Sequence, residues 1–156
     1  MSLAQEVSRT ENKEKILVID DDETITAVFR AGLKQEGFTV DVASTGKEAI
    51  EKSQAQVYNL ALIDIRLPDM EGTKLLTEMK ETTPKMRKVI VTGYPDLQNA
   101  IASVQKGADF YITKPTKIDE LVKVVREQLQ KQRAEKEYGE KKVAEYIETR
   151  FRENPL

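Results

Sequence analysis

The sequence contains no cysteine, no histidine and no tryptophan. Without cysteine there can be no disulfide, no thiolate chemistry and no cysteine-ligated zinc or iron–sulfur site. Without histidine there can be no histidine-dependent catalytic triad, no histidine–metal site and no role for this chain as a histidine phosphocarrier. No apolar run approaches the ~20 residues of a membrane span, and no signal segment opens the chain. We therefore expect a cytoplasmic protein without a membrane segment.

Charge and length set the next limits. The chain has 25 Lys and Arg against 27 Asp and Glu, a net charge of −2, which gives no electrostatic reason to expect direct nucleic-acid binding. Its 156 residues suit one domain with a short appendage. We expect residues 1–13 to be a disordered leader and residues 14–130 to form the domain. Residues 131–156, which are highly charged, are predicted to be a helical extension or a linker.

Short apolar strands alternate with amphipathic helices along the domain. The strands are expected at residues 16–19, 38–43, 60–63, 89–91 and 110–112, and a helix follows each of them. This alternation is typical of a parallel sheet with helices on both faces. The fold class predicted is α/β, a doubly wound, flavodoxin-like five-stranded sheet with strand order 2-1-3-4-5.

Several polar residues have the sequence positions of helix ends. Asp22 is a predicted N-cap of the first helix, and Gly37 is its predicted stop. Thr45 and Glu48 have the spacing of a capping box. Thr116 is predicted to cap the last helix.

Acidic and polar residues follow the predicted strands. They are Asp20, Asp21 and Asp22 after the first strand, Asp64 after the third, Thr92 after the fourth and Lys114 after the fifth. Sites in open parallel sheets form at the carboxyl ends of strands, so Asp20 or Asp21 should lie close to Asp64. Clustered carboxylates repel unless a cation compensates, and an oxygen-only donor set favours Mg²⁺. A carboxylate beside a metal, a lysine and a hydroxyl describes a site for a phosphoryl group.

Four sequence motifs contain these strand-end residues. They read ILVIDDDE at 16–23, LIDIRLPDMEG at 62–72, VIVTG at 89–93 and DFYITKP at 109–115. In this order and spacing they resemble the receiver domain of two-component response regulators, over about residues 14–130. Gly93 is a departure, because the family more often has alanine there.

The resemblance implies a role for each site residue. Asp64 would be the phosphoacceptor, and Asp20 and Asp21 the acidic pair that binds Mg²⁺ together with Asp64 and the backbone carbonyl of Arg66. The remaining implied residues are Thr92 as the switch hydroxyl, Tyr111 as the switch aromatic and Lys114 as the phosphate-binding lysine. The resemblance also implies that the Lys114–Pro115 peptide bond is cis.

The implied function is a phosphorylation-dependent signalling switch. A sensor histidine kinase or a phosphotransfer protein would supply the phosphoryl group, and the conformational change would regulate an output domain or a partner. Such a chain is a regulatory phosphoacceptor and not an enzyme, since it catalyses only its own phosphorylation and dephosphorylation. The sequence leaves open whether the receiver stands alone or belongs to a larger regulator.

Two other classes of protein fit the residues less well. A metal-dependent phosphatase with an aspartyl-phosphate intermediate needs a second acid two residues after the nucleophile, and that position is Arg66. A flavodoxin-like cofactor binder needs a phosphate-cradling loop after the first strand, where three aspartates would repel a phosphate.

The tail carries its own pattern. Val143, Tyr146, Ile147 and Phe151 form an apolar stripe at helical spacing. Because a helix this short is marginal in water, we expect it to be helical only if it docks, either on the output face of the receiver or on a second copy of the chain. We predict a helical tail that supports homodimerisation. The alternative is a frayed linker with scattered apolar residues.

Overall fold

The computed structural model describes residues 14–154, and the predicted leader at 1–13 lies outside this part of the chain. The described residues form strands and helices in strict alternation. They are β1 (Lys15–Ile19), α2 (Glu23–Gln35), β2 (Thr39–Ala43), α3 (Gly46–Ala55), β3 (Leu60–Ile63), α4 (Gly72–Glu78), β4 (Arg87–Thr92), α5 (Leu97–Gln105), β5 (Phe110–Thr113) and α6 (Ile118–Glu153). The five predicted strands are all present, with bounds that differ by at most two residues, and a helix follows each of them.

The sheet is parallel and has the predicted strand order, β2-β1-β3-β4-β5. The register pairs Ile19 with Ile63, the last residues of β1 and β3. The residues that follow these two strands therefore emerge at the same level of the same sheet edge. This register positions the candidate site.

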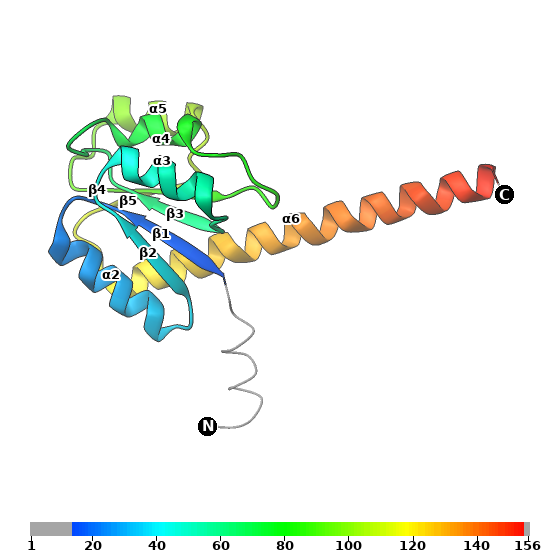
Figure 1. The fold of residues 1–156 in the computed structure, drawn as a ribbon, viewed down its shortest axis with the longest axis horizontal. Helices are drawn as coiled ribbons and strands as arrows, with labels where there is room; N and C mark the ends of the chain where they lie inside the picture. The colour runs from blue at the N-terminus through cyan, green and yellow to red at the C-terminus, as the bar shows by residue number, and fades with distance from the viewer. Residues whose placement is uncertain (1–13, 155–156) are drawn as a thin grey trace, which may run out of the picture.

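Helices cover both faces of the sheet (Figure 1). On one face α2 and α6 pack on alternate strand residues such as Val18 and Leu62, with Leu33 and Val125 from the helices. On the other face α3 and α4 cover the residues between them, such as Ile63. The central strands β1, β3 and β4 are buried on both sides, which explains why their sequences contain continuous apolar runs.

The helix ends are mostly those predicted. Asp22 Oδ1 accepts the backbone N–H groups of Thr24 and Ile25, and Thr45 Oγ1 accepts that of Glu48. The prediction for Thr116 is wrong. Helix α6 begins at Ile118 after Lys117, without a side-chain cap, because the Thr116 hydroxyl bonds to a carbonyl oxygen and to no helical N–H.

Helix α6 is a single element that runs from the domain into the tail. Its first turns pack on the sheet, and its distal half extends away from the domain (Figure 1). Because the docked part supplies the nucleus, the distal part needs no nucleation of its own. Between residues 14 and 154, no helix has both the length and the apolar character that crossing a membrane requires.

Candidate functional site

Three carboxylates meet where β1 and β3 end. Asp20 and Asp21 follow β1, Asp64 follows β3, and one oxygen from each lies within 4.8 Å of the others. Asp20 and Asp64 are buried, whereas Asp21 is exposed. The prediction that Asp20 or Asp21 approaches Asp64 is correct because parallel strands of the same register end at the same edge.

Asp64 is the buried centre of the cluster, with 7% of its surface exposed. Its Oδ1 atom is buried and has no hydrogen-bond partner among the described residues. Burial raises the pKa of the Asp64 carboxyl, and the nearby Asp20 raises it further, while the charge of Lys114 acts in the opposite direction. Because buried polar atoms are nearly always paired, this oxygen is a candidate ligand for a cation.

Lys114 brings a positive charge to the cluster from the end of β5. Its Nζ atom lies 2.5 Å from Asp20 Oδ2 and 3.5 Å from Asp64 Oδ2. Its backbone N–H donates to the Thr92 carbonyl at 2.8 Å, which fixes the lysine beside the end of β4. The Lys114–Pro115 peptide is cis, as predicted.

These groups line one cavity of about 610 Å³. The lining residues are Asp20, Asp21, Asp22, Ile25, Asp64, Arg66, Gly93, Tyr94 and Lys114. The donors offered by the aspartates are all oxygens, and the charge of one lysine does not balance three carboxylates. The unpaired Asp64 oxygen and this donor set fit a hard dication such as Mg²⁺.

Two predicted site residues do not line the cavity. Thr92 is fully buried, and its Oγ1 atom accepts the backbone N–H of Tyr94 at 3.1 Å. Tyr111 is half-buried and packs on the core that α3 and α4 cover. Burial, and to a smaller extent Asp96, raise the pKa of the Tyr111 hydroxyl. Neither Thr92 nor Tyr111 is therefore part of the cavity wall.

One contact of the cavity wall was missing from the sequence prediction. The guanidinium of Arg66 lies over the ring of Tyr94, 3.8 Å from its centroid. The two residues come from loops after different strands, so no sequence spacing links them. Both residues of this cation–π contact line the cavity.

The comparison with protein families decides the identity. The family model described as the response regulator receiver domain matches residues 16–126. The chain belongs to the response regulator receiver domain family. Receiver domains are phosphoacceptors of two-component signalling, in which phosphorylation regulates an output domain. They typically bind Mg²⁺ at an aspartate cluster, and this chain has such a cluster.

Known relatives agree with this assignment. The receiver is similar to the alginate biosynthesis transcriptional regulatory protein AlgB of Pseudomonas syringae pv. tomato, 36% identical over 78% of this chain and 27% of the relative. It is also similar to the transcriptional regulatory protein ZraR of Escherichia coli, 35% identical over 68% of this chain and 24% of the relative. The chain thus spans about a quarter of the length of these curated relatives.

Solved structures show the same fold. A CheY-like receiver domain from Methanospirillum hungatei superposes with a TM-score of 0.76 at 41% identity, over 79% of this chain and 98% of that one. A two-component response regulator from Clostridium difficile gives 0.71 at 28% identity, over 76% of this chain and 97% of that one. The receiver fold therefore accounts for the domain, and the distal part of α6 extends beyond the residues matched by the family model.

Proposed function

We propose that this receiver accepts a phosphoryl group on Asp64 from a phosphohistidine. The observation that carries the proposal is the Asp64 carboxylate itself, which has a buried, unpaired oxygen in a polar cavity beside Lys114. A sensor histidine kinase or a phosphotransfer protein supplies the donor, because this chain has no histidine of its own. The conformational change of the phosphorylated receiver then regulates an output domain or a partner.

The transfer is a displacement at phosphorus. A carboxylate oxygen of Asp64 attacks the phosphorus atom, the bond from phosphorus to the donor imidazole nitrogen breaks, and that nitrogen keeps the electron pair. The Lys114 ammonium group, already 3.5 Å from Asp64, pairs with a phosphoryl oxygen. Hydrolysis of the acyl phosphate by water restores Asp64. The chain is in this sense a regulatory phosphoacceptor that acts only on itself.

The metal ligands proposed are the carboxylates of Asp20, Asp21 and Asp64 and the backbone carbonyl of Arg66. Bound Mg²⁺ supplies compensation for the negative charge that gathers around the phosphoryl group. Asp20 also holds Lys114 in place through the ion pair between them. The three carboxylates together carry more negative charge than Lys114 neutralises, and this supports a cation site.

The switch proposed uses Thr92 and Tyr111, which do not line the cavity. A phosphoryl group on Asp64 adds negative charge and acceptor oxygens at the end of β3. The Thr92 hydroxyl, which now accepts the N–H of Tyr94, can donate to a phosphoryl oxygen if the loop after β4 moves inward. Tyr111 follows into the space that this movement leaves. Gly93, between Thr92 and the Arg66–Tyr94 stack, gives this loop little resistance to bending.

Intact mass measurement tests the phosphoacceptor. The full chain is incubated with acetyl phosphate and Mg²⁺, and the wild type should gain one phosphoryl group. Asp64→Asn should gain none. Asp119→Asn is the matched control and should be labelled like the wild type, because Asp119 is an exposed residue in the first turn of α6 and does not line the cavity. Equal labelling of Asp64→Asn and the wild type would reject the assignment.

A further inference from the structure

The apolar stripe of the tail continues the face by which α6 docks on its own domain. The buried residues of α6 are Leu121, Val125, Gln128, Leu129 and Gln132. Further steps of three or four residues lead from Gln132 to Lys136, Gly139, Val143 and Ile147, which therefore lie on the same face of the helix. Val143 is 58% exposed and Ile147 is 49% exposed. One face of α6 is thus covered as far as Gln132 and uncovered beyond it.

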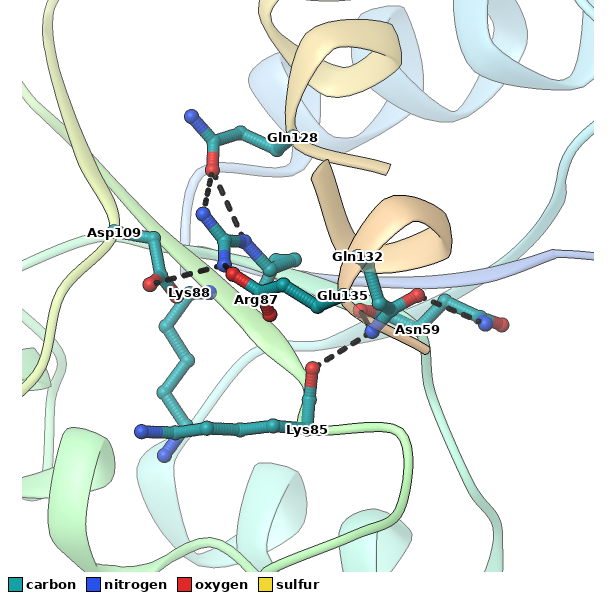
Figure 2. Close-up of polar contacts among 8 residues, drawn as sticks. All are labelled: Asn59, Lys85, Arg87, Lys88, Asp109, Gln128, Gln132 and Glu135. Atoms are coloured by element: carbon teal, nitrogen blue, oxygen red, sulfur yellow. Dashed lines mark hydrogen bonds and ion pairs between the residues drawn. The ribbon is translucent and has the colours of Figure 1, made fainter. Parts of the chain in front are cut away.

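A polar network fixes the helix at the point where the covered part ends (Figure 2). Gln132 Nε2 donates to the carbonyl oxygens of Asn59 at 2.9 Å and Lys85 at 2.7 Å. Four residues earlier, Gln128 Oε1 accepts two bonds from the Arg87 guanidinium, at 2.8 and 3.1 Å. Both glutamines are buried. The direction in which α6 leaves the domain is therefore set by the sheet.

The network also shapes a groove at the edge of the domain. One wall is formed by Thr83, Pro84 and Lys85, and the other by the face of α6 between Gln132 and Ile147. The groove has a volume of about 680 Å³. Because Gln132 bonds to the Lys85 carbonyl, the wall and the helix are held together at the inner end. The folded domain therefore holds this groove in place beside the exposed apolar stripe of α6.

We propose that a second copy of this chain binds here, with its own α6 antiparallel to the first. Two helices that pair through identical faces form a closed, self-complementary contact. The partner segment is the distal part of α6, from Lys136 to Glu153, which spans about 27 Å at 1.5 Å per residue. This inference concerns a surface remote from Asp64 and does not depend on the proposed phosphorylation.

The position of the stripe selects the antiparallel arrangement. In a parallel pair, the second helix would run along the same face of α6 towards residue 118. It would collide there with the domain, which already covers this face up to Gln132. In an antiparallel pair, Val143 of each chain lies opposite Ile147 of the other. The segment of the partner helix that its own domain covers, up to Gln132, then lies past Glu153, the last residue of the first helix. The two domains then lie at opposite ends of the pair without overlap.

The same register is favourable in size and charge. With Val143 opposite Ile147, Glu140 of one chain lies opposite Arg150 of the other, an ion pair of opposite charges. Gly139 lies opposite Phe151, so the residue without a side chain faces the largest one. Phe151, which is 60% exposed, then enters the groove beside Pro84. The aromatic ring gives this contact its apolar anchor.

Sedimentation of the full chain measures the association. The wild type should be a dimer at high concentration, and Ile147→Glu should shift it to the monomer. Thr149→Glu is the matched control, because it makes the same charge change on the opposite face and should leave the dimer intact. Glu140→Arg and Arg150→Glu should each weaken the dimer, while the double variant restores it. Circular dichroism of each variant checks that the fold is retained.

Disulfide trapping tests the orientation, and the absence of native cysteine makes it clean. In the proposed register Lys136 lies opposite Asn154. A mixture of Lys136→Cys and Asn154→Cys chains should form a disulfide-linked heterodimer under oxidation, whereas each variant alone should not cross-link with itself. Self-linked dimers of each variant would show parallel pairing and overturn the proposal. A wild-type chain that stays monomeric at all concentrations would also overturn the proposal. The apolar stripe would then be a binding surface for another domain or a different protein.

Discussion

Gly72 lies directly against the backbone carbonyl of Asp64. A Cβ atom at residue 72 would be 1.9 Å from the Asp64 oxygen and 2.8 Å from its carbonyl carbon. The Gly72 N–H donates to the Ile65 carbonyl at 2.6 Å, so the start of α4 is tied to the loop that carries the proposed phosphoacceptor. The backbone at Asp64 is thus held in place by a residue that has no side chain.

Gly72→Ala should therefore disturb both folding and phosphorylation. A methyl group at this place forces backbone apart, and overpacking of this kind costs about 1–3 kcal/mol. Urea unfolding should show the loss, and labelling with acetyl phosphate should slow because Asp64 moves. Lys74→Ala is the control, because it introduces alanine at an exposed position of the same helix. Wild-type stability and labelling of Gly72→Ala would contradict this account of the loop.

The Gln132 side chain should contribute measurably to stability. In Gln132→Ala the buried Lys85 carbonyl loses its donor from Gln132, while the Asn59 carbonyl keeps the N–H of Arg87. Loss of a buried partner costs about 1–3 kcal/mol. Urea unfolding compares this variant with Gln130→Ala, which changes an exposed glutamine of the same helix. An equal free energy of unfolding for the two variants would show that the Gln132 contacts do not hold α6.

Arg87 should not be replaceable by lysine. Its guanidinium bonds Gln128 through two nitrogens and lies 3.2 Å from Glu135 and 3.7 Å from Asp109. A lysine ammonium cannot make this fork of contacts, so Arg87→Lys should leave the buried Gln128 amide poorly paired. We expect a loss of about 1–3 kcal/mol in the free energy of unfolding. A double-mutant cycle with Gln128→Leu should recover part of this loss, and strictly additive losses would argue against direct coupling.

Removal of the metal should lower the thermal stability of the protein, because the clustered carboxylates then repel one another. Mg²⁺ binds the folded state, so it should raise the midpoint of thermal unfolding of the wild type above the value in EDTA. Asp21→Asn should lose most of this increase. In EDTA the variant should be at least as stable as the wild type, because one of three neighbouring negative charges is gone and Asp21 is exposed. A full response of Asp21→Asn to Mg²⁺ would remove Asp21 from the metal site.

The sequence predicted the sheet and the carboxylate cluster for a common reason. Continuous apolar strands separated by helices leave few topologies, and the topology alone brings Asp20 next to Asp64. The failed cap at Thr116 shows the limit of local patterns, because α6 begins at Ile118, one residue later than a cap at Thr116 would place its start. The contacts of Arg87 with Gln128 and of Arg66 with Tyr94 join distant segments, and only the packed fold defines them. The length of α6 is likewise not defined by a local pattern, because its first turns are held by packing on the sheet.

The most direct test of the central claim is to locate the phosphoryl group on the chain. The protein is phosphorylated with acetyl phosphate, the acyl phosphate is reduced with borohydride, and the peptides are sequenced by mass spectrometry. Reduction converts a phosphorylated aspartate into homoserine and leaves free aspartates unchanged. The account predicts homoserine at Asp64 alone. Homoserine at Asp20, Asp21 or Asp69 with none at Asp64 would contradict it.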